Sequence, residues 1–136
     1  MKLKTHAISA GAISYLGGAG FFGILWCVLG AVFPDTDHHN SLAGKLLPLH
    51  KIKSLKHRTY THSLFLAPFF FMVDFWLGIG FISHVFLDLL TPSGVYFLYP
   101  FYEEKVNISY IRVGGDEEFV IYWGVIAILI QIIFVV

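Results

Sequence analysis

The chain has 136 residues, of which 57% are hydrophobic and 13% are charged, with equal numbers of acidic and basic side chains. Because about a quarter of the residues in a soluble domain are usually charged, we expect a membrane protein with one domain, residues 1–136. The single cysteine, Cys27, excludes an intramolecular disulfide and a cysteine-ligated zinc cluster. A metal site in this chain must therefore use histidine and carboxylate ligands.

The first apolar stretch covers residues 7–33 and follows a basic start. It is longer than the apolar core of a signal peptide, so we interpret it as retained membrane structure. One helix from His6 to Phe33 would be about 40 Å long, which exceeds the ~30 Å hydrocarbon core of a bilayer. The sequence GGAG at 17–20 favours a turn. This predicts a hairpin of two short helices, over about 5–16 and 20–33.

The apolar region 60–91 is also too long for one membrane span. Its segment VDFWLGIG, residues 73–80, contains an aspartate and two glycines and predicts the turn of a second hairpin. The last segment, residues 119–136, has no charged side chain and is long enough to span a bilayer as a helix. The acids of VGGDEEF before it suit a first helical turn. The sequence therefore predicts an all-α polytopic membrane protein with two short helical hairpins and a C-terminal transmembrane helix. Each hairpin helix is marginal as a full span, so the hairpins either enter the membrane partly, tilt, or pack around a water-filled cavity.

The basic residues predict an orientation. Seven of the nine Lys and Arg residues lie in residues 1–58, and the two hairpins would place all seven on one side of the membrane. By the positive-inside rule this side is cytoplasmic. The predicted turns contain no Lys or Arg, which fits the opposite side.

His84 and Asp88 lie near the end of the fourth predicted helix. Their i,i+4 spacing puts an imidazole and a carboxylate on the same helix face. Their surroundings, GFISHVFLDLL, are apolar, so an unpaired ionised carboxylate would be costly there. An Asp–His hydrogen bond between packed helices would offset that cost, and so would a metal ion. We expect a metal role, because other candidate ligands converge on the same membrane face.

The motif FPDTDHH follows the second predicted helix. Pro34 ends that helix, and Asp35, Asp37 and His38 follow it in a loop. We expect Asp35 and one of Asp37 or His38 to be metal ligands, although a solvated helix exit would have the same composition. His6, at the start of the first helix, is a further candidate ligand, with a solvated chain end as the alternative.

The stretch KHRTYTHSLF leads into the second hairpin. Thr59 or Thr61 is expected to cap the third helix. This would place His62 in its first turn and His57 before it, folded back toward the site. Arg58 is expected to contact either a substrate oxygen or lipid headgroups.

The segments TH, FPDTDH, HRTYTHSL and SHVFLDLLTPSGV occur in this order along nearly the whole chain. Together they resemble the YdjM-like family of predicted inner-membrane metal-dependent hydrolases. The resemblance implies a multi-pass protein of a prokaryotic inner membrane. It also implies the metal ligands His6, Asp35, Asp37, His38, His57, His62, His84 and Asp88. More loosely, the H-x-x-x-D pattern on a helix is similar to that of the zinc-dependent phospholipase C group.

We expect one or two divalent metal ions at the cytoplasmic face. Nitrogen and oxygen ligands suit zinc, with manganese or iron as alternatives. The expected reaction is hydrolysis of a lipid-like phosphoester by a metal-activated water. Asp35 or Asp37 would act as base if it is not a metal ligand, and Arg58 would stabilise an anionic oxygen. The expected partners are membrane lipids and this substrate, and nothing indicates nucleic-acid binding. A non-catalytic metal-binding or metal-transporting protein is the alternative.

Overall fold

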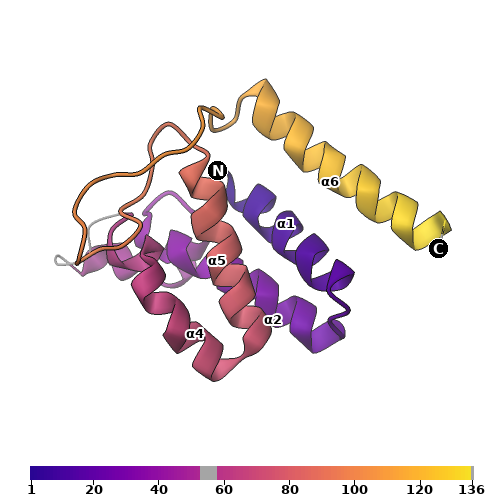
Figure 1. The fold of residues 1–136 in the computed structure, drawn as a ribbon, viewed down its shortest axis with the longest axis horizontal. Coiled ribbons are helices and arrows are strands. Elements are labelled where there is room, and N and C mark those ends of the chain that lie inside the picture. The colour runs from indigo at the N-terminus through magenta and orange to yellow at the C-terminus, as the bar shows by residue number, and fades with distance from the viewer. Residues whose placement is uncertain (53–57, 136) are drawn as a thin grey trace.

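The computed structural model describes residues 1–52 and 58–135, and within these ranges the protein is all-α (Figure 1). The longer helices are α1 (Leu3–Leu16), α2 (Phe21–Val32), α5 (Phe75–Leu89) and α6 (Asp116–Val135). The shorter ones are η1 (Phe33–Asp37), α3 (Leu42–Leu46), η2 (Leu49–Lys51), η3 (Tyr60–His62), η4 (Leu64–Leu66) and α4 (Ala67–Val73). The described residues contain an isolated antiparallel bridge between Val95 and Val106 but no strand. The predicted all-α class is therefore confirmed for the described residues.

The first predicted hairpin is formed by α1 and α2. Its turn lies at residues 17–20, as expected, and Gly18 adopts a positive φ of 79°. Residues with a side chain rarely adopt this conformation, which explains why a glycine breaks the apolar stretch at this point.

The second hairpin is formed by α4 and α5, but its turn is shorter than expected. The chain turns at Asp74, whose carboxylate accepts hydrogen bonds from the backbone N–H groups of Trp76 at 2.8 Å and Leu77 at 3.2 Å. This is an N-cap for α5. The prediction that Gly78 and Gly80 belong to the turn is wrong, because both lie inside α5.

These glycines instead allow helices to pack closely. A Cβ atom on Gly80 would lie 1.9 Å from the carbonyl oxygen of Cys27 in α2, and one on Gly30 would lie 2.1 Å from the carbonyl oxygen of Leu77 in α5. Neither position has room for a side chain. The backbones of α2 and α5 are therefore in direct contact, and this contact aligns the ends of the two hairpins.

Helix α6 lies beside α1 (Figure 1). Of the described helices, it is the one long and apolar enough to cross a membrane, over Asp116–Phe134, and 6% of this stretch is buried. Its buried Glu118 carboxylate accepts hydrogen bonds from Lys2 N at 2.5 Å and Thr5 Oγ1 at 2.7 Å. Glu118 therefore joins the start of α6 to the start of α1.

The segment before α4 differs from its prediction. Thr59 precedes η3 without a side-chain capping bond, and α4 begins at Ala67 after two 3₁₀ turns. The prediction that Thr59 or Thr61 caps this helix is wrong. His62 consequently lies in η3 and not in the first turn of an α-helix. This irregular segment brings it beside the end of α5.

Candidate metal centre

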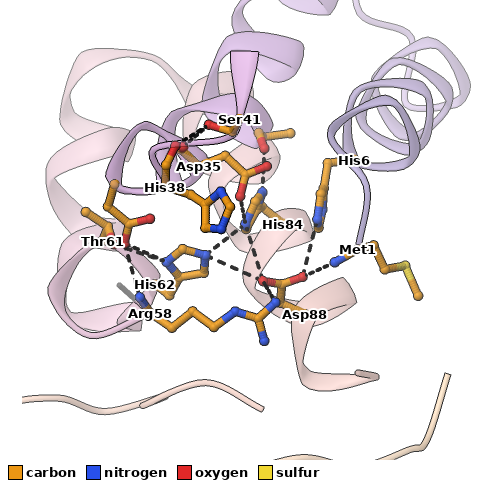
Figure 2. A network of polar contacts seen from close by, with 12 residues as sticks. Met1, His6, Asp35, His38, Ser41, Arg58, Thr61, His62, His84 and Asp88 are labelled. Carbon is orange, nitrogen blue, oxygen red and sulfur yellow. Dashed lines mark hydrogen bonds and ion pairs between the residues drawn. The ribbon is translucent and has the colours of Figure 1, made fainter. Parts of the chain in front are cut away.

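Side chains from four elements meet where α1 begins and α5 ends (Figure 2). Their donor atoms form two groups, each with all atoms within 4.8 Å of one another. The first group contains His6, His84 and Asp88, and the second contains Asp35, His62 and His84. His84 belongs to both. Four of these five residues are buried, and Asp35 is partly exposed.

The distances in this cluster fit shared metal ligation. His6 Nε2 lies 3.3 Å from Asp88 Oδ1, and His62 Nε2 lies 3.5 Å from Asp88 Oδ2. His84 Nε2 lies 3.2 Å from His62 Nε2 and 3.9 Å from Asp35 Oδ1. Two ligand atoms on one tetrahedral zinc ion are about 3.3–3.4 Å apart, given bonds of ~2.0–2.1 Å. The donor atoms are therefore close to the spacing that such an ion requires.

The His6 imidazole gives a second indication of a cation. Its ring is fully buried and stacks on the His84 ring, with centroids 3.8 Å apart. Neither ring nitrogen of His6 makes a hydrogen bond to the described residues. Nε2 lies within ion-pair distance of Asp88 Oδ1 but lacks hydrogen-bond geometry, and a buried polar group without a hydrogen bond is unfavourable in a folded protein. A divalent metal ion would supply a partner for His6, so the residues present fit such an ion.

Neighbouring groups orient two of the imidazoles. His84 Nδ1 lies 2.6 Å from the carbonyl oxygen of Ala31, which leaves Nε2 directed into the cluster. His62 Nδ1 lies 3.1 Å from Thr61 Oγ1 and 3.6 Å from Asp37 Oδ2. Contacts of this kind set the tautomer and direction of histidine ligands in metal sites.

Asp37 lies behind His62, outside both donor groups. Its Oδ2 accepts hydrogen bonds from the Thr61 hydroxyl and, at 3.1 Å, from the Arg58 backbone N–H. Asp37 was predicted as a candidate ligand, but FPDTD alone does not show which of its two aspartates faces the cluster. The carbonyl group of Ala31 could not be predicted, since no side chain marks it.

Arg58 points into the cluster. Its guanidinium lies 3.1 Å from Asp88 Oδ2 and donates to the carbonyl oxygen of Gly94 at 3.0 Å and to Thr91 Oγ1 at 3.3 Å. Its φ is 64°, a left-handed conformation that costs a non-glycine residue ~1–2 kcal/mol. In this conformation the Arg58 backbone N–H donates to Asp37 Oδ2, and its carbonyl oxygen accepts from Tyr96 N at 3.3 Å. Arg58 therefore pairs with a carboxylate of the cluster, and its expected contact with a substrate oxygen or lipid headgroups stays a prediction.

The other two predicted ligands are His38 and His57. His38 is partly exposed, stacks on His39 and is in neither donor group. His57 lies outside the described residues. The α-amino group of Met1 also contacts Asp88 Oδ1 (Figure 2). Next to the cluster is a pocket of about 410 Å³, whose walls include Lys2, Asp35, His38, Ser41 and Arg58.

Comparison with known proteins identifies the family. The whole chain, residues 1–136, matches the model of the family described as YdjM inner membrane protein. The chain belongs to the YdjM family. The resemblance predicted from the four motifs is thus confirmed, and with it the assignment to the inner membrane.

Two relatives define the extent of this similarity. The chain is 33% identical over 143 residues to YvsG of Bacillus subtilis, with 91% of this chain and 89% of that protein covered. It is 35% identical over 98 residues to the inner membrane protein YdjM of Escherichia coli, with 57% of this chain and 46% of that protein covered. The match therefore spans about half the length of the E. coli protein. No solved structure matches the chain.

In this YdjM family protein, burial and neighbouring charges shift the pKa values of two candidate ligands, Asp35 and His62. Burial raises the pKa of Asp35 above its ordinary value, which favours the protonated carboxyl group. Burial works to lower the pKa of His62, but hydrogen bonds to Asp37 and Asp88 outweigh it, and the pKa of His62 is raised. Metal binding at these two residues would therefore compete with proton binding.

Proposed function

We propose that this chain is a membrane-bound, metal-dependent hydrolase of the inner membrane that acts on a phosphoester of a lipid-like substrate. The observation that carries the proposal is the buried cluster of two donor groups that share His84 and adjoin a polar pocket. Perturbed titratable groups beside a pocket mark a candidate catalytic site.

The cluster would hold one or two divalent metal ions. His6, His84 and Asp88 would hold one, and Asp35 and His62, together with His84, would hold a second or complete the first. Imidazole and carboxylate donors without sulfur suit zinc best, while manganese and iron accept the same donors. When bound, such an ion polarises a scissile group and makes a bound water more acidic.

The pocket supports an anionic substrate. Two of the residues that line it, Lys2 and Arg58, carry positive charge at neutral pH. A guanidinium has five N–H donors, more than Arg58 uses in the three contacts described above, so it can also bind a phosphoryl oxygen. Positive charge at this position would stabilise the negative charge that develops on a phosphoester oxygen.

If His6, His84 and Asp88 hold the metal without Asp35, Asp35 is the better candidate for the proton acceptor. It lines the pocket, its side chain is 14% exposed, and its raised pKa brings it closer to the range in which a carboxylate accepts protons at neutral pH. Asp37 is buried, and one of its oxygens is engaged by Arg58 and Thr61. We therefore assign Asp37 a positioning role for His62.

We propose that the site lies at the cytoplasmic face. The support is the basic character of the segments around the cluster, which include Lys2, Lys4, Lys45 and Lys51. The positive-inside rule assigns these segments to the cytoplasm. At this face the pocket would meet lipid headgroups, which carry phosphoester bonds.

The test combines metal analysis with turnover. Purified protein in lipid nanodiscs should contain stoichiometric zinc, manganese or iron and release product from a phospholipid or a soluble phosphodiester. His84→Ala should lose both properties, whereas His39→Ala, a histidine outside both donor groups, should keep them. Metal without turnover, together with metal flux into protein-containing liposomes, would support the transport alternative. Absence of metal from the wild type after metal-supplemented expression would refute the proposal.

A further inference from the structure

Large apolar side chains are exposed at the tips of both hairpins. Phe21 and Phe22, at the first tip, are 77% and 73% exposed. At the second tip Met72 is 84% exposed, and its neighbours Val73 and Phe75 are also exposed. The described chain leaves this surface uncovered. Exposure of such an apolar patch to water would be unfavourable.

The two tips lie together, away from the metal centre. The Trp76 ring at the start of α5 packs against the first turn, where a Cβ on Gly17 or Gly23 would lie 2.6 Å or 2.7 Å from it. Helix α1 begins at the metal centre and α5 ends there, so both hairpins run from the centre to a shared apolar end (Figure 1).

The hairpins are too short to cross a bilayer. With 14, 12 and 15 residues, α1, α2 and α5 are ~21, ~18 and ~22 Å long. The hydrocarbon core of a bilayer is ~30 Å thick, and any tilt of a helix reduces the thickness it spans. Helix α6, with 20 residues, is ~30 Å long. Helix α6 is therefore long enough to cross the hydrocarbon core, whereas α1, α2 and α5 are not.

The hairpins also carry almost no charged side chains. Residues 7–34 contain no Asp, Glu, Lys or Arg, and residues 59–87 contain only Asp74. The carboxylate of Asp74 accepts two backbone N–H groups, which lowers the cost of placing it in an apolar medium. At the opposite end, the loop after α5 exposes aromatic residues such as Phe101 and Tyr110, which suit the headgroup zone.

We propose that both hairpins enter the membrane from the face that carries the metal centre and end within the hydrocarbon core. Acyl chains of that leaflet cover Phe21, Phe22, Met72 and Val73. Among the described helices, α6 alone then crosses the membrane, in place of the multi-pass arrangement expected from the sequence. The metal centre sits at headgroup depth. This arrangement stands independently of the proposed hydrolase activity.

Cysteine accessibility tests the arrangement. Gly20→Cys probes the first tip, where a Cβ meets no atom within 4 Å, and Met72→Cys probes the second. Asn40→Cys, in an exposed loop, marks the metal-centre side. A cysteine appended beyond α6 marks the other side. The parent chain, whose only cysteine is the buried Cys27, gives the background. Each protein is treated with a membrane-impermeant maleimide in spheroplasts and in inverted vesicles.

The expected result is that the two reference cysteines label from opposite sides, while the tip cysteines label from neither. In detergent denatured samples all four should label. Labelling of either tip together with the cysteine beyond α6 would show that a hairpin crosses the membrane and would overturn the proposal. Labelling of either tip together with Asn40→Cys would also overturn it, because the hairpins would then lie outside the bilayer. Since both references are internal, the result does not depend on which face is cytoplasmic.

Discussion

The position of Asp37 behind His62 leads to a quantitative prediction. Asp37→Asn keeps the size of the side chain but removes the negative charge 3.6 Å from His62 Nδ1. His62 would keep its place in the donor group and lose part of its orientation. Changing a group that orients a metal ligand typically weakens metal binding ~10–100-fold. This range corresponds to a loss of about 1.4–2.7 kcal/mol in binding free energy.

Asp88→Asn should have a larger effect. Asp88 lies 3.3 Å from His6, 3.5 Å from His62 and 3.1 Å from Arg58, so it links one donor group to the other and to the cation beside them. We expect this variant to lose stoichiometric metal. Asp74→Asn is the matched control, because Asp74 caps α5 at the far end of the hairpin and asparagine is an equally good N-cap.

The assay is competition for zinc between the purified protein and a chromophoric chelator. Asp37→Asn should bind one equivalent with a raised Kd, Asp88→Asn should not compete, and Asp74→Asn should match the wild type. Two results would refute the reasoning. Wild-type affinity in Asp37→Asn would show that Asp37 does not orient His62, and complete loss of binding would show that it is itself a ligand.

Other predictions concern packing and pH. Gly80→Ala would place a methyl group 1.9 Å from an α2 carbonyl oxygen. We expect the free energy of unfolding to fall by ~1–3 kcal/mol or more, with a lower midpoint of thermal unfolding in detergent. Gly124→Ala in α6, where a Cβ meets no atom within 4 Å, should show no such loss. Glu118→Ala leaves three donors without their acceptor. It should lower the free energy of unfolding by ~1–3 kcal/mol and also lower the midpoint of thermal unfolding. Zinc affinity should fall as the pH is lowered, beginning above the pKa of an ordinary histidine, because the raised pKa of His62 favours an imidazolium that cannot bind metal. Chelator competition from about pH 8 to about pH 6 measures this, and a flat profile would contradict it.

Several elements were predictable because a local physical cause decides them. GGAG breaks the first apolar stretch, since a side chain is unfavourable at the positive φ of Gly18. The length and composition of the last segment identify α6. The i,i+4 spacing of His84 and Asp88 places them on one face of α5, wherever that helix packs.

Other features depend on contacts between distant segments. Gly78 and Gly80 look like turn residues in the sequence, yet they lie inside α5, where Gly80 allows close contact with α2. Only the tertiary structure shows that Asp35 joins a donor group while Asp37 supports His62, since both follow Pro34 in the same short segment.

The sequence by itself determined the helical class, the hairpin order and the residue types of the cluster. Each of these follows from glycine conformation, apolar length or helical spacing, which act within one segment. The tertiary structure decided which donors meet at His84, why Arg58 adopts a left-handed conformation and how the hairpin tips come together. These features arise from packing α2 against α5 and from the fold of the segments before α4, and no single segment specifies either.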